Sequence, residues 1–198
     1  MIAILDYGSG NLRSALRAFE TTGREVTLTS DPEIAVKASA LVVPGVGAFG
    51  SCMKGLKSVN GDSVIQERFK SGKPTLGICI GMQILFQTGL EHGNFSGVGV
   101  VGGEVAKLNA PVLPHMGWNT VRIEGRSKLF NGIEEESFYF VHSYAAPAVK
   151  VGQVSAYTNY HGEFLSAFEF DSLAATQFHP EKSGPAGLKL IKNWVESI

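Results

Sequence analysis

A cysteine lies between a predicted strand and a predicted helix, with one glycine two residues before it and another two residues after it. The segment Gly77–Gly81, of sequence GICIG, follows an apolar run that begins at Pro74 and precedes Met82–Gln87, whose pattern predicts an amphipathic helix. Glycines allow a strand and a helix to approach where a Cβ would clash. The layout matches the strained turn G-x-S-x-G, which presents a side chain at the top of an α/β sheet. The segment therefore predicts an α/β sheet with Cys79 at the end of a strand.

Cys79 has the setting of a reactive thiol. Backbone N–H groups and the dipole at the start of a helix favour a thiolate over a thiol. The alternative is a buried structural cysteine, because free cysteines are among the most buried residues. The second cysteine, Cys52, is interpreted as a small core or surface residue. The two form no C-x-x-C motif, and the opening residues lack the basic flank of a signal peptide, so we expect reduced thiols and a cytoplasmic location.

Length and composition are those of one globular domain, which we expect to span residues 1–198. Apolar residues make up 44% of the chain and charged residues 18%, which argues against disorder. A formal net charge of −1 provides no electrostatic attraction to nucleic acid or to a membrane surface. No apolar run approaches the ~18 residues that a membrane-spanning helix needs. We therefore expect neither nucleic acid nor a membrane as a partner.

The first half of the chain alternates between strand and helix patterns. Strands are predicted at Met1–Asp6, Glu25–Thr29 and Leu41–Val43, and helices after Asn11, after Asp31 and within Asp62–Ser71. This alternation predicts a doubly wound, mostly parallel central sheet flanked by helices.

After about residue 96 the pattern changes to strands without long helices between them. These strands are predicted at Val98–Leu108, Thr120–Ile123, Ser137–Tyr144, Val154–Tyr160, Glu163–Phe170 and Leu173–Gln177. They indicate an antiparallel layer added to the parallel sheet. A final helix is predicted with Ser183 as its N-cap, Pro185 in its first turn, and one apolar face. That predicted face consists of Leu188, Ile191, Val195 and Ile198.

The segment His179-Pro180-Glu181 supplies the groups that a nucleophilic cysteine needs. A thiol nucleophile requires a base, and the base requires a group that orients it. Proline keeps the preceding residue extended, and residues i and i+2 of an extended chain face the same way, so Glu181 can hold the His179 ring. The alternatives are a histidine at a strand end whose hydrogen bonds are already satisfied, and a carboxylate that interacts with the dipole of the following helix.

Two glycine-rich loops follow predicted strands. At Gly45–Gly47, inward-facing N–H groups of Gly47 and of Ile80 would form an oxyanion hole for a tetrahedral intermediate. The alternative is an ordinary strand-to-helix turn. In the first loop Gly8 and Gly10 begin a dinucleotide-type motif, but Arg13 occupies its third glycine position, so nucleotide binding is not supported.

The other histidines show no metal-ligand spacing, so we expect neither a metal nor a cofactor. Strand alternation places His142 on the same face as Phe138 and Phe140, where core packing is expected unless the strand borders the site. From its residues alone, the chain is therefore predicted to be a thiol acyl-transfer enzyme of undetermined substrate.

Three segments taken together resemble the class I (triad) glutamine amidotransferases over almost the whole chain. They are Pro44-Gly45-Val46-Gly47, Gly77-Ile78-Cys79-Ile80-Gly81-Met82-Gln83 and His179-Pro180-Glu181. Two further segments narrow the resemblance to the family of glutaminase subunits of imidazole glycerol phosphate synthases. These are Asp6-Tyr7-Gly8-Ser9-Gly10-Asn11-Leu12 and Pro114-His115-Met116-Gly117-Trp118-Asn119.

The resemblance implies a flavodoxin-like glutamine amidotransferase fold with Cys79, His179 and Glu181 as its catalytic triad. Cys79 would attack the carboxamide of glutamine, His179 would pass a proton to departing ammonia, and water would release glutamate from the thioester. The family's positions around glutamine correspond to Gly45, Gly47, Gln83, Glu91, His142, Ser143 and Tyr144.

The resemblance also implies a heterodimer with a (β/α)8-barrel cyclase that consumes the ammonia in histidine biosynthesis. The family's docking surface corresponds to Asn11, Met116, Trp118, Asn119, Tyr139 and Lys182. The alternative for Trp118 is burial in the domain's own core. Alternative functions are the glutaminase of another synthase, such as pyridoxal phosphate synthase, a DJ-1-like or peptidase-like thiol hydrolase, and a non-enzymatic binding module.

Overall fold

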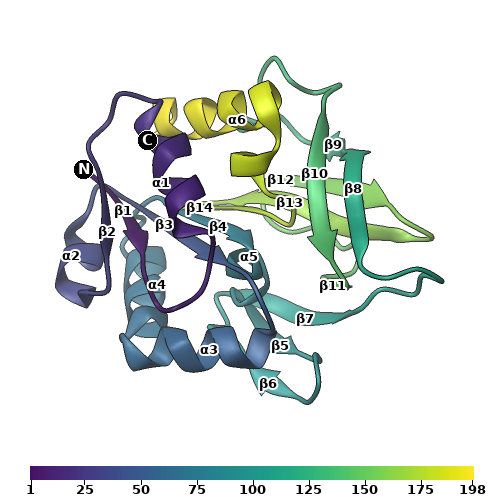
Figure 1. Ribbon diagram of the computed structural model, residues 1–198, viewed down its shortest axis with the longest axis horizontal. Helices are drawn as coiled ribbons and strands as arrows, with labels where there is room; N and C mark the ends of the chain where they lie inside the picture. Colours follow the sequence, from purple (N-terminus) through teal and green to yellow (C-terminus); the bar gives the residue numbers. More distant parts are fainter.

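An eight-stranded mixed sheet forms the centre of the computed structural model, which describes residues 1–198 (Figure 1). Its strands are β1 (Ile2–Leu5), β2 (Val26–Thr29), β3 (Ala40–Gly45), β4 (Thr75–Cys79), β9 (Arg122–Glu124), β12 (Val154–Asn159), β13 (Glu163–Phe170) and β14 (Leu173–Thr176). Their order is β2-β1-β3-β4-β14-β13-β12-β9. The strands from β2 to β14 in this order are parallel, and β13, β12 and β9 continue the sheet in antiparallel fashion. The predicted, mostly parallel sheet is confirmed.

Helices cover both faces of the parallel part of the sheet. They are α1 (Leu12–Glu20), α2 (Pro32–Lys37), α3 (Phe49–Ser58), α4 (Gly61–Lys70) and α6 (Gly184–Glu196). In Figure 1, α1 and α6 lie on one face, and α3 and α4 lie on the other. Strands β1, β3 and β4 are buried along their whole length, as parallel strands covered on both faces must be. Asn11 and Asp31 cap α1 and α2, as the sequence predicts.

Two smaller sheets pack beside the central one. One contains β5 (Phe86–Gly89), β6 (Phe95–Ser96), β7 (Val101–Lys107) and β11 (Tyr144–Ala145), and the other contains β8 (His115–Thr120) and β10 (Ser137–His142). The predicted strand 120–123 is thus divided between β8 and β9, and the predicted strand 137–144 is divided between β10 and β11. The antiparallel strands therefore both extend the central sheet and form separate small sheets. No helix of the structure combines the length and apolar character that crossing a membrane requires.

The predicted helix Met82–Gln87 is wrong. The helix α5 has a single turn, Ile80–Gln83, and β5 begins at Phe86. Ile84, Leu85 and Phe86 are all fully buried, so the segment has no polar face that would distinguish a helix from a strand. The main-chain carbonyls of Ile84 and Phe86 accept hydrogen bonds from the 98–99 segment. Pairing with a neighbouring segment therefore replaces the helix.

The predicted apolar face of α6 is confirmed at Ile191 and Val195, which are buried, and is wrong at Leu188 and Ile198, which are 40% and 41% exposed. The buried face includes Leu190 and Trp194 instead. Gly187 also lies on the buried face, where a Cβ would be 1.9 Å from the carbonyl oxygen of Pro180. Ser183 precedes α6, but its side chain makes no cap hydrogen bond.

Candidate active site

Cys79 ends β4 and begins α5 in a strained conformation, with φ of +56° and ψ of −110°. Positive φ is costly for a residue with a side chain and occurs mainly where surrounding structure enforces it. The two glycines enforce it here. A Cβ at Gly81 would lie 1.7 Å from the carbonyl oxygen of Val43, and one at Gly77 would lie 2.6 Å from the oxygen of Gly81. The expected elbow is therefore present, with Cys79 3% exposed.

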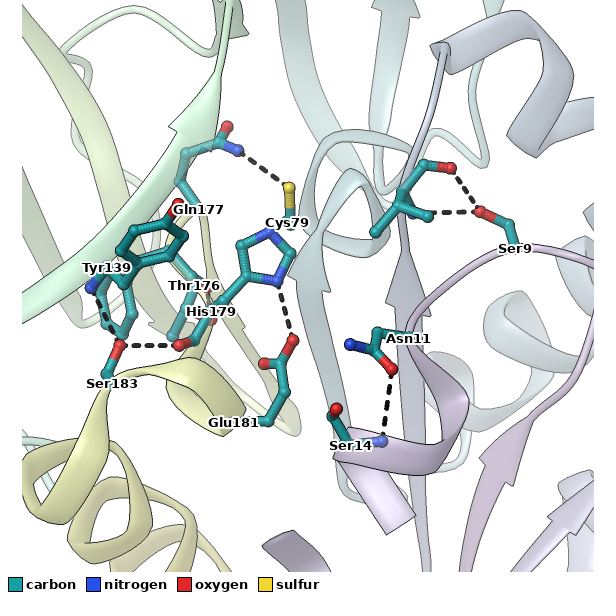
Figure 2. Close-up of polar contacts among 12 residues, drawn as sticks. Ser9, Asn11, Ser14, Cys79, Tyr139, Thr176, Gln177, His179, Glu181 and Ser183 are labelled. Atoms are coloured by element: carbon teal, nitrogen blue, oxygen red, sulfur yellow. Dashed lines mark hydrogen bonds and ion pairs between the residues drawn. The ribbon is translucent and has the colours of Figure 1, made fainter. Parts of the chain in front are cut away.

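His179 reaches the same site because β14, which ends just before it, pairs with β4. Its Nδ1 lies 2.8 Å from Oε1 of Glu181, and both side chains are buried. Figure 2 shows the His179 ring between Cys79 and Glu181. The Nε2 atom makes no hydrogen bond within the protein. Glu181 lies in a 3-10 turn, η1 (Pro180–Lys182), rather than in the extended chain that the sequence reasoning assumed.

The charges around His179 favour an imidazolium ion. Burial lowers the pKa of His179, but Cys79 and the Glu181 carboxylate outweigh burial and raise that pKa to about 10. A cysteine sulfur beside an imidazolium ion places a nucleophile and a proton donor together. This arrangement can perform acyl transfer through a thioester.

A cavity of about 300 Å³ opens beside the thiol and contains both Cys79 and His179 in its wall. Most residues predicted to surround glutamine line it: Gly47, Gln83, Glu91, His142, Ser143 and Tyr144, together with Ile80 and Lys182. Gly45 does not line the cavity. It pairs with Cys79 in the sheet, and a Cβ there would lie 2.8 Å from the Gly81 nitrogen.

Glu91 and Val46 are held by contacts that the sequence did not indicate. The Glu91 carboxylate accepts a hydrogen bond from the Phe49 N–H at 2.7 Å, at the start of α3. Val46 N–H donates to Oγ of Ser9 at 3.0 Å, and the Ser9 hydroxyl donates to the Val46 carbonyl at 2.7 Å. Cys52, a buried free thiol, also contacts the Val46 carbonyl at 3.3 Å. The only sequence signal for the contact between Ser9 and Val46 is that Ser9 lies between two loop glycines.

Gln177 is the residue of this site that sequence reasoning missed. Its side chain is fully buried and its Nε2 lies 3.8 Å from Sγ of Cys79 (Figure 2). The sequence pattern predicts Gln177 only as the last residue of a strand. Its position two residues before His179 on the same chain segment was the available signal.

The residues predicted to dock a partner are largely exposed. Met116 and Trp118 in β8 are 62% and 58% exposed, so the alternative of a core Trp118 is wrong. Trp118 meets Tyr139 of β10 edge to face, with ring centroids 6.2 Å apart. Asn11 and Lys182 are exposed, and Asn119 is half-buried. Asn11 begins α1, which contacts the η1 turn.

No group of three or more His, Cys, Asp or Glu side chains is arranged to hold a metal ion. Both cysteines are free thiols.

The fold and the buried Cys-His-Glu arrangement define an elbow-cysteine α/β protein of the amidotransferase type. The family model described as "Glutamine amidotransferase class-I" matches residues 3–198, and the chain belongs to this family. Within it, the chain is similar to proteins named "Imidazole glycerol phosphate synthase subunit HisH". It is 49% identical to that of Bifidobacterium longum over 98% of both chains, and 50% identical to that of Corynebacterium diphtheriae over 100% of this chain and 99% of the relative. It is 51% identical to that of Mycobacterium bovis, over 100% of this chain and 98% of the relative.

Solved structures support the fold. One described as "Crystal structure of glutamine amidotransferase" superposes with a TM-score of 0.77 at 16% identity, covering 98% of this chain and 97% of the other. A second, described as "Structure of PurLQS from Thermotoga maritima", superposes with a TM-score of 0.74 at 17% identity, covering 99% of this chain and 97% of the other. At such low identity these likenesses show the fold alone.

Proposed function

We propose that this chain is a glutaminase subunit of imidazole glycerol phosphate synthase. It hydrolyses glutamine to glutamate and ammonia and delivers the ammonia to a (β/α)8-barrel cyclase subunit, in the cytoplasm. The observation that carries the proposal is the buried His179–Glu181 pair, 2.8 Å apart, beside a strained Cys79 that faces a cavity. The names of the full-length relatives favour this function over a different thiol hydrolase or a different synthase partner.

The reaction follows from the proposed roles of three side chains. The Cys79 thiolate attacks the carboxamide carbon of glutamine, and the negative charge moves to the carboxamide oxygen. The His179 imidazolium ion then gives its Nε2 proton to the departing nitrogen, so ammonia leaves and a thioester remains. The thiolate charge that raised the pKa of His179 is now gone, so neutral His179 can accept a proton from water. That water releases glutamate and restores the thiolate, while Glu181 holds the ring throughout.

The cavity walls would bind the rest of the substrate. Gln83, Glu91 and Ser143 provide amide, carboxylate and hydroxyl groups around the space, and His142 and Tyr144 form part of its wall. Polar groups that converge on a small cavity are typical of a site for an amino acid. The N–H groups of Gly47 and Ile80 are the proposed donors to the oxyanion.

The proposed partner explains the exposed apolar side chains of β8. Ammonia released into neutral water becomes mostly ammonium, which is no nucleophile, so the product must pass directly to the enzyme that uses it. Met116 and Trp118 present apolar surface beside the polar Asn11, Asn119, Tyr139 and Lys182. Aromatic and methionine side chains with a polar rim are typical of protein interfaces. The cyclase uses ammonia on a phosphoribulosyl-formimino-aminoimidazole carboxamide ribonucleotide.

Glutamate production by the chain should be measured alone, with the barrel cyclase, and with the cyclase and its nucleotide ligand. We expect weak turnover alone and a large rise with both. The reason is the Gly45–Gly47 segment, whose peptide orientation can switch: the Ser9 hydroxyl holds the Val46 carbonyl, which belongs to the same peptide group as the Gly47 N–H proposed to bind the oxyanion. Cys79→Ala serves as the inactive control. High turnover without the cyclase would contradict the gating, and no turnover in any mixture would contradict the function.

A further inference from the structure

We propose that Gln177 is a positioning residue for Cys79, held in place by a buried hydrogen-bond relay that starts at Asn119 in β8. This inference rests on the proposed function, because it assigns the groups that prepare the same thiolate. The relay runs from the exposed docking strand to the nucleophile through side chains of four segments and the main-chain carbonyl of Tyr144.

The first step is the contact between the amide of Gln177 and the thiol. Gln177 Nε2 donates toward Sγ of Cys79 at 3.8 Å, from a side chain with no exposed surface. Its main-chain N–H donates to the Ser166 carbonyl at 2.8 Å, which fixes the backbone from which the side chain projects. A hydrogen bond donated to sulfur stabilises the thiolate more than the thiol. Gln177 therefore both directs the sulfur and favours its reactive form.

The second step fixes the direction of the Gln177 amide. Gln83 Nε2 donates to Oε1 of Gln177 at 2.9 Å and to the Tyr144 carbonyl at 2.8 Å. Both hydrogens of the Gln83 amide are thus in use. If the Gln177 amide were reversed, its NH2 group would face the NH2 group of Gln83, and its oxygen would face the sulfur. The reversed orientation would leave the Gln83 N–H without its acceptor on Gln177, so Gln83 holds the donor toward Cys79.

The third step extends the relay through two histidines. His142 Nδ1 lies 2.9 Å from the Tyr144 carbonyl, which can only accept, so Nδ1 carries the proton. His142 Nε2 is then an acceptor, and His115 Nδ1–H donates a hydrogen bond to it at 3.2 Å. His115 Nε2 in turn accepts from Asn119 Nδ2 at 3.3 Å. Burial lowers the pKa of His142 to about 3 and that of His115 to about 4, so both rings are neutral at neutral pH.

The fourth step places the start of the relay at the candidate docking surface. Asn119 Nδ2 uses its second hydrogen on the Asn159 carbonyl at 3.1 Å, which holds the amide in this direction. Asn119 lies next to the exposed Trp118 in β8. His115 is stacked between Tyr160 and Phe140, with ring centroids 4.1 and 4.9 Å away, so it cannot turn freely. A movement of β8 on docking would therefore reach Gln177 through fixed contacts.

The test measures how fast iodoacetamide alkylates Cys79 as a function of pH, in the full chain, by mass spectrometry of the peptide that contains Cys79. The variants are Gln177→Leu, which removes the donor, and Gln177→Glu, which keeps the size but turns an acceptor toward sulfur. Ser166→Ala is the matched control, because Ser166 is equally buried on the adjacent strand and its Oγ has no partner. The other titratable groups near Cys79 are unchanged in all of these variants: His179, Glu181, His142, Glu91, Lys182, Tyr7 and Cys52.

We expect the midpoint of the alkylation profile to rise by about one pH unit in Gln177→Leu, and further in Gln177→Glu. Below the midpoint, alkylation becomes about tenfold slower, and at high pH the rates converge. A role in folding alone would leave the profile of the folded variant unchanged. If both folded variants keep the parent profile, Gln177 does not position the thiolate. The alkylation measurement needs no glutamine, so it tests Gln177 separately from the proposed function. Failure of the proposed function would appear as no glutamine turnover by the parent with its cyclase.

A second measurement tests the far end of the relay. Nitrogen-15 NMR of the parent is expected to show His115 and His142 neutral and protonated at Nδ1. Asn119→Asp replaces the donor by an acceptor, so His115 is expected to carry its proton on Nε2. The tautomer of His142 then changes as well, from Nδ1-protonated to Nε2-protonated. The unprotonated Nδ1 of His142 would then face the Tyr144 carbonyl, and that hydrogen bond would be lost. We expect the reversed tautomers and an upward shift of the Cys79 profile. Nε2 protonation in the parent, or an unchanged profile in Asn119→Asp, would overturn the relay.

Discussion

The hydroxyl of Ser9 bonds both backbone polar groups of Val46, accepting from its N–H at 3.0 Å and donating to its carbonyl at 2.7 Å. Ser9 belongs to the loop after β1, and Val46 to the loop after β3. Cys52 of α3 adds a contact between its sulfur and the same carbonyl. One side chain thus holds the peptide groups on both sides of Val46, in the segment next to the nucleophile.

We expect Ser9→Ala to release this segment and to raise glutaminase activity in the absence of the cyclase by about tenfold. The loss of two hydrogen bonds removes roughly 1–3 kcal/mol from the resting orientation, and about 1.4 kcal/mol corresponds to a tenfold change in population. Activity with the cyclase bound should change little. Glutamate production with and without cyclase measures both values.

Ser51→Ala is the control for Ser9→Ala, because Ser51 is an exposed serine of the neighbouring α3 helix. If Ser9→Ala and Ser51→Ala show the same cyclase-free activity as the parent, the bonds to Ser9 do not restrain turnover.

The proposed triad predicts a graded series of losses. Cys79→Ala and His179→Asn should each reduce glutamine turnover by about a thousandfold or more, because each removes a reacting group. Glu181→Gln should reduce it less, because glutamine still accepts from His179 Nδ1 and only the charge is lost. Steady-state kinetics measure the series, and circular dichroism shows whether each variant is folded. Substantial residual turnover in a folded Cys79 or His179 variant would contradict these roles.

Local motifs made part of this site predictable. The glycines around Cys79 and the three-residue segment His179–Glu181 each place their side chains through short-range geometry, and the strand patterns place both segments at neighbouring strand ends. The contacts of Ser9 and Gln177 were not predictable in this way. Gln177 is 98 positions from Cys79 in the chain, and no local pattern indicates such a pairing.

Buried polar residues are a further feature of the fold that the sequence pattern does not reveal. Arg68 has no exposed surface, because its guanidinium donates to main-chain carbonyls of Ala35, Ala38 and Pro74. An arginine is ordinarily read as a surface residue. Likewise, His115 and His142 become internal polar groups only because each ring nitrogen finds a partner. The hydrogen bonds of these buried side chains depend on tertiary contacts, so the sequence shows no periodic pattern that would predict them.

Acid should destabilise the protein through His142. Its pKa is about 3 when folded and near 6.5 when unfolded, so the unfolded chain binds a proton more readily between these values. The stabilising contribution of neutral His142 is therefore complete above about pH 6.5 and is lost as the pH falls toward 3. Its slope is roughly 1 kcal/mol per pH unit.

Urea unfolding at a series of pH values from 7 to 4 measures this slope. His142→Gln should show a shallower fall in the free energy of unfolding than the parent. The exposed His92 provides the control, His92→Gln, which should follow the parent. Equal slopes for the parent and His142→Gln would show that protonation of His142 does not drive the loss.

Trp118→Ala should weaken binding of the barrel cyclase. Trp118 is 58% exposed and meets Tyr139 across the β8–β10 pair, so truncation removes a large aromatic surface without opening the core. Aromatic anchors near the centre of an interface contribute about 2 kcal/mol or more, which corresponds to about a thirtyfold rise in Kd. Calorimetric titration of the chain with the cyclase measures this change. Leu28→Ala, at a partly exposed residue on the edge strand β2, is the matched control and should leave Kd unchanged. An unchanged Kd for folded Trp118→Ala would place the docking surface elsewhere.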